Sequence, residues 1–351
     1  MESGTIEQTL PGLESEIPRV EMTTGHAIPL APRKRLMVFA GRSHPELAAQ
    51  IAERLGVELG EIELTTFANG ETYCRYCESI RGADVFIVQT GSQPVDQNIM
   101  ELLFMIQAAK LASAKRITAV VPWFPYSRQD RKAKPREPIS SRLLADMLQA
   151  SGVDRLLTMD LHAGQVQGFF TIPVDHMTAL PLFAQHFRDL GLTGSGVVSV
   201  APDAGRARQT VRFAEMVDAE FAIMHKTRPT HDVSAVTEIT GRVAGKVAIV
   251  GDDNISTGTT LLEGARALKE AGAKDVWVFA THGLFSGDAL ERFAAAELAG
   301  IVVTDTVPVD PLRRPESMTV LTVCGLLAET IMNVFADESV SAIFGGENQL
   351  F

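Results

Sequence analysis

The sequence is poor in cysteine and has no long hydrophobic segment. Three cysteines among 351 residues are too few for a disulfide framework. No apolar run reaches the roughly 18 to 20 residues that span a bilayer. The first 33 residues lack the basic start and the apolar segment of a secretory signal peptide. We therefore expect a cytoplasmic protein with no membrane partner.

Positive charge is also scarce. Lys and Arg total 32 against 43 Asp and Glu, and the net charge of −11 disfavours a nucleic-acid partner, which needs a broad basic surface. Residues 128–136 depart from this balance, with five basic residues and one acid. A solvated charged surface is the ordinary interpretation. The alternative is a small polyphosphate site, because the segment follows an apolar strand candidate, residues 117–122, and ligands of open α/β sheets bind beyond strand carboxyl ends.

Short apolar runs alternate with segments of helical period, which is typical of an α/β fold with a parallel sheet covered by helices. The opening unit shows both signals. Residues 36–40 form a strand candidate, Pro45 stands where a helix would begin, and Gly56 stands where it would end. Apolar residues at every fourth position between them would bury one stripe of this helix against the sheet.

Strand candidates of the first half recur in the second half at a nearly constant spacing. Runs that start at Leu36, Val85 and Ile117 are matched by runs that start at Val197, Val247 and Val276, with offsets of 161, 162 and 159 residues. Such regularity predicts an internal duplication. We expect two similar parallel-sheet domains, residues 34–176 and 177–351, after a flexible extension, residues 1–33.

The two halves differ at the end of one strand candidate. After residues 247–250 the second half reads Gly-Asp-Asp-Asn-Ile-Ser-Thr-Gly-Thr-Thr, whereas the first half has no acidic pair at the matching place. Two carboxylates can accept hydrogen bonds from sugar hydroxyls or help to hold Mg2+. The loop after them would present amides and hydroxyls to a phosphate at the start of a helix near residues 260–271. The alternative is a structural acidic turn with a helix cap.

This string resembles the ribose-5-phosphate loop of the phosphoribosyltransferase superfamily. Nearly all of the chain after residue 34 resembles one branch, the ribose-phosphate pyrophosphokinases, and the most specific motifs occupy residues 67–71, 122–132, 160–170 and 225–229. The resemblance implies domains of phosphoribosyltransferase type. It also implies an enzyme that transfers the diphosphoryl group of Mg-ATP to the C1 hydroxyl of ribose 5-phosphate and releases AMP.

The resemblance implies roles for individual residues in binding ATP and the Mg2+ cofactor. A loop that reads adenine across a subunit boundary would contain Phe67, Asn69, Gly70 and Glu71. Other positions that bind ATP would be Arg128, Gln129 and Asp130. The Mg2+ positions are matched by His162 and Asp203. Without the resemblance, residues 67–71 would be taken as an Asn-Gly turn and the histidine as a structural residue.

The resemblance also identifies residues for catalysis and for the sugar phosphate. Lys226 and Arg228 match a catalytic pair on a loop that closes over the reaction. Ribose 5-phosphate would be bound by Arg228, Asp252, Asp253, Ser256, Thr257, Gly258, Thr259 and Thr260. Ser256 and Thr259 stand where the family usually has Asp and Gly. Thr259 would cost about 1 to 2 kcal/mol if the turn required a left-handed backbone there.

These departures keep two alternatives open. One is a non-catalytic regulatory paralogue that assembles with an active enzyme, and the other is a phosphoribosyltransferase that consumes phosphoribosyl pyrophosphate. The second alternative has no use for the ATP motifs of the first half. Family likeness also implies a homo-oligomer, commonly a hexamer built from dimers.

Overall fold

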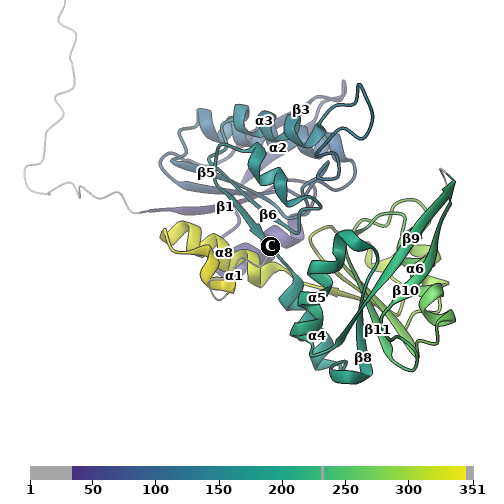
Figure 1. The fold of residues 1–351 in the computed structure, drawn as a ribbon. Helices are drawn as coiled ribbons and strands as arrows, with labels where there is room; N and C mark the ends of the chain where they lie inside the picture. The colour runs from purple at the N-terminus through teal and green to yellow at the C-terminus, as the bar shows by residue number, and fades with distance from the viewer. Residues whose placement is uncertain (1–33, 231–232, 345–351) are drawn as a thin grey trace, which may run out of the picture. The chain divides into compact units, whose positions relative to one another are not determined.

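The structure is a computed structural model that describes residues 34–230 and 233–344. Side chains are described for these residues except 226–230, 233–237, 342 and 344, and the predicted extension, residues 1–33, lies outside the described residues. Figure 1 shows the chain as a ribbon. In the part of the chain that is described, no helix has the length and apolar character needed to cross a membrane.

The opening unit forms as the sequence predicts. Strand β1, Leu36–Ala40, leads to helix α1, Pro45–Leu55, which begins at its proline and ends where Gly56 adopts a left-handed backbone with φ 68°. Pro suits the first helical position because its missing N–H would have no partner there, and Gly suits the end because it has no Cβ to clash. Local residue chemistry is therefore enough to fix this unit.

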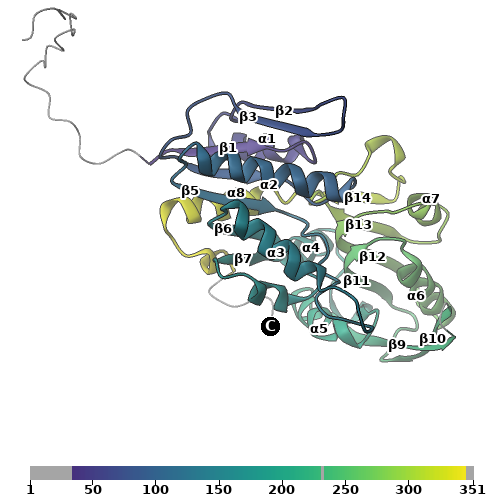
Figure 2. The same cartoon turned by 90° about the horizontal axis from the view of Figure 1, so that it is seen from above.

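The first half forms a parallel sheet with the strand order β1-β4-β5-β6-β7. The later strands are β4 (Asp84–Val88), β5 (Arg116–Val121), β6 (Arg155–Met159) and β7 (Val174–Met177). Helices α2 (Val95–Leu111) and α3 (Ser140–Ser151) cover one face, and α1 packs on the other. A separate hairpin, β2 (Ile62–Thr66) with β3 (Thr72–Tyr76), lies against α2, where the Tyr76 hydroxyl donates to Met105 O at 2.9 Å (Figure 2).

The second half forms a sheet with the order β10-β9-β8-β11-β12-β13-β14, in which β9 and β10 are antiparallel and the other pairs are parallel. Its strands are β8 (Val197–Ala201), β9 (Glu220–Thr230), β10 (Val233–Thr240), β11 (Val247–Ile255), β12 (Asp275–Gly283), β13 (Gly300–Thr304) and β14 (Met318–Leu321). Helices α6 (Thr259–Glu270) and α7 (Ala289–Ala294) pack on one face, and α4 (Leu180–Asp189) and α5 (Ala207–Met216) pack on the other.

The strand order of the first sheet recurs in the second. The order β8-β11-β12-β13-β14 repeats β1-β4-β5-β6-β7, and in both halves a hairpin lies between the first two of these strands in the sequence. The predicted α/β class with two similar parallel sheets is confirmed. The hairpins differ in one respect, because β9 joins its sheet beside β8 whereas β2 and β3 form a small sheet of their own.

The two halves share one hydrophobic cluster. Helix α8, Cys324–Ala336, packs against α1 (Figure 1). Leu327 of α8 lies in the same buried cluster as Val38 of β1 and Ile249 of β11. The end of the second half thus completes the core of the first, and the limits 34–176 and 177–351 remain a prediction.

Candidate active site

Both halves of the chain line a cleft of about 700 Å³. The first half contributes Arg128 and Gln129 from the loop after β5, and the second half contributes Asn254 and Ser256 from the end of β11 and the residue after it. Both loops follow the carboxyl ends of parallel strands, where ligands of such sheets bind. The loop that carries Arg128 and the end of β11 therefore meet at one cleft, while Asp252 and Asp253 line a different, smaller cavity.

In the loop after β5, Gln129 is hydrogen-bonded to the start of α3, whereas Arg128 is exposed. Gln129 Oε1 accepts from Ser140 Oγ at 2.6 Å, and its carbonyl oxygen accepts from Ser141 Oγ at 3.0 Å, which ties the loop to the start of α3. Arg128 is exposed at the cleft, and a guanidinium there suits phosphate oxygens. Asp130 instead accepts from Gln165 Nε2 and does not line the cleft.

The predicted adenine loop is the turn of the β2–β3 hairpin. Asn69 Nδ2 donates to Glu71 Oε2 at 2.8 Å, Glu71 N donates to Asn69 Oδ1 at 3.1 Å, and Gly70 has a left-handed backbone with φ 91°. Phe67 is 52% exposed, so its ring is available to stack on a planar ligand. These residues do not line the cleft of their own chain, and their predicted role requires a second subunit.

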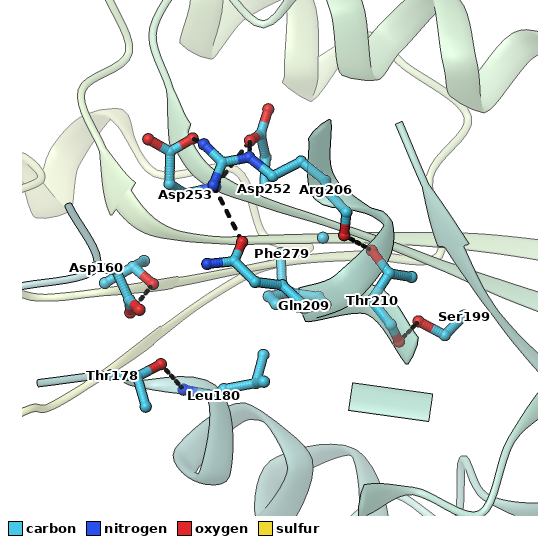
Figure 3. A pocket seen from close by; sticks show the side chains of 12 residues that line it. Asp160, Thr178, Leu180, Ser199, Arg206, Gln209, Thr210, Asp252, Asp253 and Phe279 are labelled. Atoms are coloured by element: carbon cyan, nitrogen blue, oxygen red, sulfur yellow. Dashed lines mark hydrogen bonds and ion pairs between the residues drawn. The ribbon is translucent and has the colours of Figure 1, made fainter. Parts of the chain in front are cut away.

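Asp252 and Asp253 lie near the end of β11 and line a smaller cavity of about 30 Å³ (Figure 3). The Asp253 side chain is almost fully buried. Arg206, at the start of α5, reaches both carboxylates: its Nε lies 3.1 Å from Asp252 Oδ1, and its Nη2 donates to Asp253 Oδ1. Asn254 Nδ2 donates to Asp253 Oδ2 at 2.9 Å. The acidic pair is thus partly compensated in charge and oriented by a cation of the same chain.

Burial and charge give the two carboxyl groups different pKa values. Burial, and then the charge of Asp253, raise the pKa of Asp252 to about 7, although Arg206 opposes the rise. Burial alone would also raise the pKa of Asp253, but the hydrogen bond from His162 and the charge of Arg206 hold that pKa well below its usual range. Asp252 is therefore the member of the pair that exchanges a proton near neutral pH, while Asp253 stays ionised.

His162 is oriented by Asp253. Its Nδ1 lies 2.9 Å from Asp253 Oδ2 and 2.9 Å from Arg206 Nη2. With a proton, Nδ1 is a donor and can bond only to the Asp253 carboxylate. Without a proton, it is an acceptor and can bond only to the Arg206 guanidinium, so a given tautomer makes one of these two hydrogen bonds. We assign the Nδ1 proton to the carboxylate, because a charged acceptor makes the stronger bond. Nε2 then keeps its lone pair, as in metal-binding histidines whose other ring nitrogen donates to a carboxylate.

The second predicted metal position, Asp203, stands at the beginning of a short 3-10 turn, Ala204–Arg206, where its Oδ1 accepts from Arg206 N at 3.3 Å. Asp203 is exposed. Within the described residues, no group of three or more His, Cys, Asp or Glu side chains forms a metal cage. The Mg2+ role of His162 and Asp203 remains a prediction.

The loop after the acidic pair presents hydroxyl groups at the start of α6. Ser256 Oγ lies 3.3 Å from Ser286 Oγ, and Thr257 Oγ1 lies 3.4 Å from Thr259 Oγ1. Arg292 Nη1 donates to Thr257 O at 3.1 Å and adds positive charge to the loop. Thr260 is the second residue of the helix. The helix begins within one residue of its predicted start, and its amides can receive an anion.

The condition for backbone strain at Thr259, a left-handed backbone there, is not met. Gly258 takes the left-handed position, with φ 72°, and Thr259 is the first residue of α6. A Cβ on Gly258 would also come within 2.1 Å of the Phe293 ring. The turn therefore requires glycine at 258, and a β-branched residue is accommodated at 259.

The predicted catalytic pair belongs to β9. The backbone of Lys226 and Arg228 is extended, and Lys226 is paired with Val236 of β10. The sequence predicts a loop here, whereas the described backbone forms two antiparallel strands, since the segment adds to the edge of the second sheet beside β8. The side chains of Lys226 and Arg228 lie outside the described residues. Their catalytic role remains a prediction.

Sequence reasoning missed Arg206. A cation at the start of a helix is unfavourable against the helix dipole unless acidic partners compensate. That signal could have marked Arg206 as a residue with buried partners. The cleft is also lined by Phe285, Ser286 and Arg313, for which we find no sequence signal.

Two family models match the chain. The N-terminal domain of ribose phosphate pyrophosphokinase matches residues 36–152, and the phosphoribosyl synthetase-associated domain matches residues 226–345. The chain is 45% identical to the ribose-phosphate pyrophosphokinase of Fusobacterium nucleatum over 307 residues, which cover 88% of this chain and 97% of that protein. It is 46% identical to the ribose-phosphate pyrophosphokinase of Caldanaerobacter subterraneus over 309 residues, which cover 88% and 98%.

A solved structure agrees with these relatives. The phosphoribosylpyrophosphate synthetase from Mycobacterium smegmatis superimposes with a TM-score of 0.80 at 44% identity, covering 87% of this chain and 100% of that one. Sequence and fold thus lead to the same conclusion: the chain belongs to the ribose-phosphate pyrophosphokinase family.

Proposed function

We propose that the chain transfers the diphosphoryl group of Mg-ATP to the C1 hydroxyl of ribose 5-phosphate, giving phosphoribosyl pyrophosphate and AMP. The observation that carries the proposal is the cleft that Arg128 and Gln129 share with Asn254 and Ser256. One wall offers a cation to a polyphosphate, and the other leads to the hydroxyls and helix N-terminus that suit a sugar phosphate. The two substrates can therefore meet.

The nucleotide side of the site would use Arg128 for phosphate oxygens and the backbone and side chain of Gln129 to hold the loop. Mg2+ would be held by Nε2 of His162 and by Asp203, and it would supply positive charge where negative charge develops on the transferred group. Asp253, whose Oδ2 lies 2.9 Å from Nδ1 of His162, would hold the tautomer that leaves Nε2 free. Asp130, which pairs with Gln165, would position the loop instead of contacting ATP.

The sugar side would use the start of α6. The phosphate of ribose 5-phosphate would lie against the amides and hydroxyls of residues 256–260, with Arg292 nearby as a further positive charge. Asp252, whose pKa is raised to about 7, would accept a hydrogen bond from a sugar hydroxyl. Asp253 is already engaged by Arg206 and His162, so it would act through them instead of touching the sugar.

Three further assignments belong to this proposal. Lys226 and Arg228 would neutralise charge on the transferred diphosphoryl group when the β9–β10 hairpin region closes over the substrates. The adenine of ATP in a neighbouring subunit would be bound by Phe67, Asn69, Gly70 and Glu71. This role requires a homo-oligomer, which we propose is a hexamer built from dimers. The protein would act in the cytoplasm.

The test is a product analysis of the purified chain with ATP, Mg2+ and ribose 5-phosphate. AMP that forms only when the sugar phosphate is present supports the proposal. If no AMP forms, the chain is a non-catalytic paralogue. If added phosphoribosyl pyrophosphate is instead consumed with a nucleobase, the chain is a phosphoribosyltransferase.

A matched pair of variants tests the cleft itself. Arg128→Gln should raise the KM for ATP about tenfold, because a charged hydrogen bond to phosphate is lost. Arg142→Gln makes the same change on α3, where Arg142 is exposed and pairs with Asp146 at 2.9 Å. This control should keep the wild-type KM, and equal effects of the two substitutions would argue against a specific role for Arg128.

A further inference from the structure

Arg206 is a buried cation that none of the predicted roles uses. Only 10% of its side chain is exposed. Its Nε lies 3.1 Å from Asp252 Oδ1, its Nη2 donates to Asp253 Oδ1, and its Nη1 donates to Gln209 Oε1 at 3.0 Å (Figure 3). Every nitrogen of the guanidinium therefore lies close to a side-chain oxygen.

The backbone of Arg206 is fixed as well. Its N–H donates to Asp203 O at 3.2 Å, and its carbonyl oxygen accepts from Thr210 Oγ1 at 2.9 Å. A rotation of the side chain away from the acidic pair would leave two neighbouring, largely buried carboxylates without their cation, which is strongly unfavourable. Arg206 is thus held in place from both ends.

Asp252 Oδ1 and both carboxylate oxygens of Asp253 are engaged by groups of the chain itself. Asp252 Oδ1 lies 3.1 Å from Arg206 Nε and accepts from Asp253 N at 2.8 Å. Asp253 Oδ1 accepts from Arg206, and Asp253 Oδ2 accepts from His162 and Asn254. Mg2+ requires nearly octahedral oxygen ligands at about 2.1 Å and keeps several waters. The guanidinium occupies this space and repels the charge of such an ion.

We infer that Arg206 is the resident counter-ion of the acidic pair: it takes the place of a divalent cation at Asp252 and Asp253. The inference concerns the chain without substrates and does not rest on the proposed function. Since a guanidinium is permanently charged, the pair keeps one compensating positive charge whether or not metal is present.

Mn2+ alone is the probe for this inference. Its binding to the full chain, without nucleotide or sugar phosphate, is counted by electron paramagnetic resonance. Arg206→Gln should create one additional Mn2+ site per chain or tighten Mn2+ binding about tenfold or more. The double variant Arg206→Gln with Asp252→Asn should lose this additional Mn2+ binding. Arg208→Gln, the same change at an exposed position of α5, should bind Mn2+ as the wild type does.

Equal Mn2+ binding by folded Arg206→Gln and by the wild type would overturn the inference. A second comparison does not depend on the folding of that variant. Asp252→Asn should bind as much Mn2+ as the wild type, because Arg206 already excludes the ion there, and a loss of Mn2+ in Asp252→Asn would also overturn it. Neither measurement involves turnover, so the inference and the proposed reaction can fail separately.

Discussion

Removing the charge of Asp253 tests the network at the end of β11. In Asp253→Asn, the buried Arg206 loses the partner of its Nη2, and His162 loses the carboxylate that accepts from Nδ1. Breaking a buried ion pair by removing one partner costs about 3 to 5 kcal/mol. Asp252 remains 3.1 Å from Arg206 Nε. We therefore expect a cost at the lower end of this range, a decrease of about 3 kcal/mol in the free energy of unfolding.

The assay is urea unfolding at neutral to mildly alkaline pH, followed by circular dichroism, with Asp146→Asn as the control. Asp146 forms an exposed pair with Arg142 one helical turn away, so its loss should cost about 0.5 kcal/mol or less. AMP formation should also fall about 10- to 100-fold in Asp253→Asn alone, because His162 is no longer oriented. Equal stability of the two variants would refute the reasoning.

Three further predictions concern pH, the start of α6 and the catalytic pair. Burial lowers the pKa of His176 from 6.5 to about 4, so the unfolded chain binds the proton more readily than the folded chain. The free energy of unfolding should therefore fall by about 3 kcal/mol as the pH drops from 6.5 to about 4. In urea unfolding at a series of pH values, His176→Gln should show a smaller fall. Gly258→Ala should cost about 2 to 4 kcal/mol by thermal or urea unfolding, because of its φ of 72° and the Phe293 ring. Lys226→Ala should lower kcat about 100-fold or more with little change in KM, and a near-normal kcat at saturating substrate would exclude the assigned role.

Local residue chemistry made much of the fold predictable. Pro45 and Gly56 mark the ends of α1 because each has a backbone constraint that acts at one position. The repeated spacing of apolar runs predicted the matching strands of the two sheets, since each run supplies a strand that is buried on both faces. The loop at residues 251–260 was found for the same reason: its glycine, hydroxyls and acidic pair act within a few residues of one another.

Features that depend on contacts between distant segments were not predictable. Helix α8 completes the core around α1, although nothing in its own sequence names that partner. The segment that carries Lys226 joins the second sheet as β9, because the edge of β8 offers unpaired backbone groups that only the folded sheet creates. Arg206 acquires its role from Asp252 and Asp253, which lie more than forty residues away in the sequence.

The most direct test of the central claim follows the phosphorus atoms of ATP. The chain is incubated with ribose 5-phosphate and ATP labelled with 32P at the β position, and the products are separated. We predict that the β label appears in the sugar diphosphate while unlabelled AMP is released, since the proposed reaction joins the C1 hydroxyl to the β-phosphorus. Recovery of the β label in ADP, with transfer of the γ-phosphoryl group alone, would contradict it.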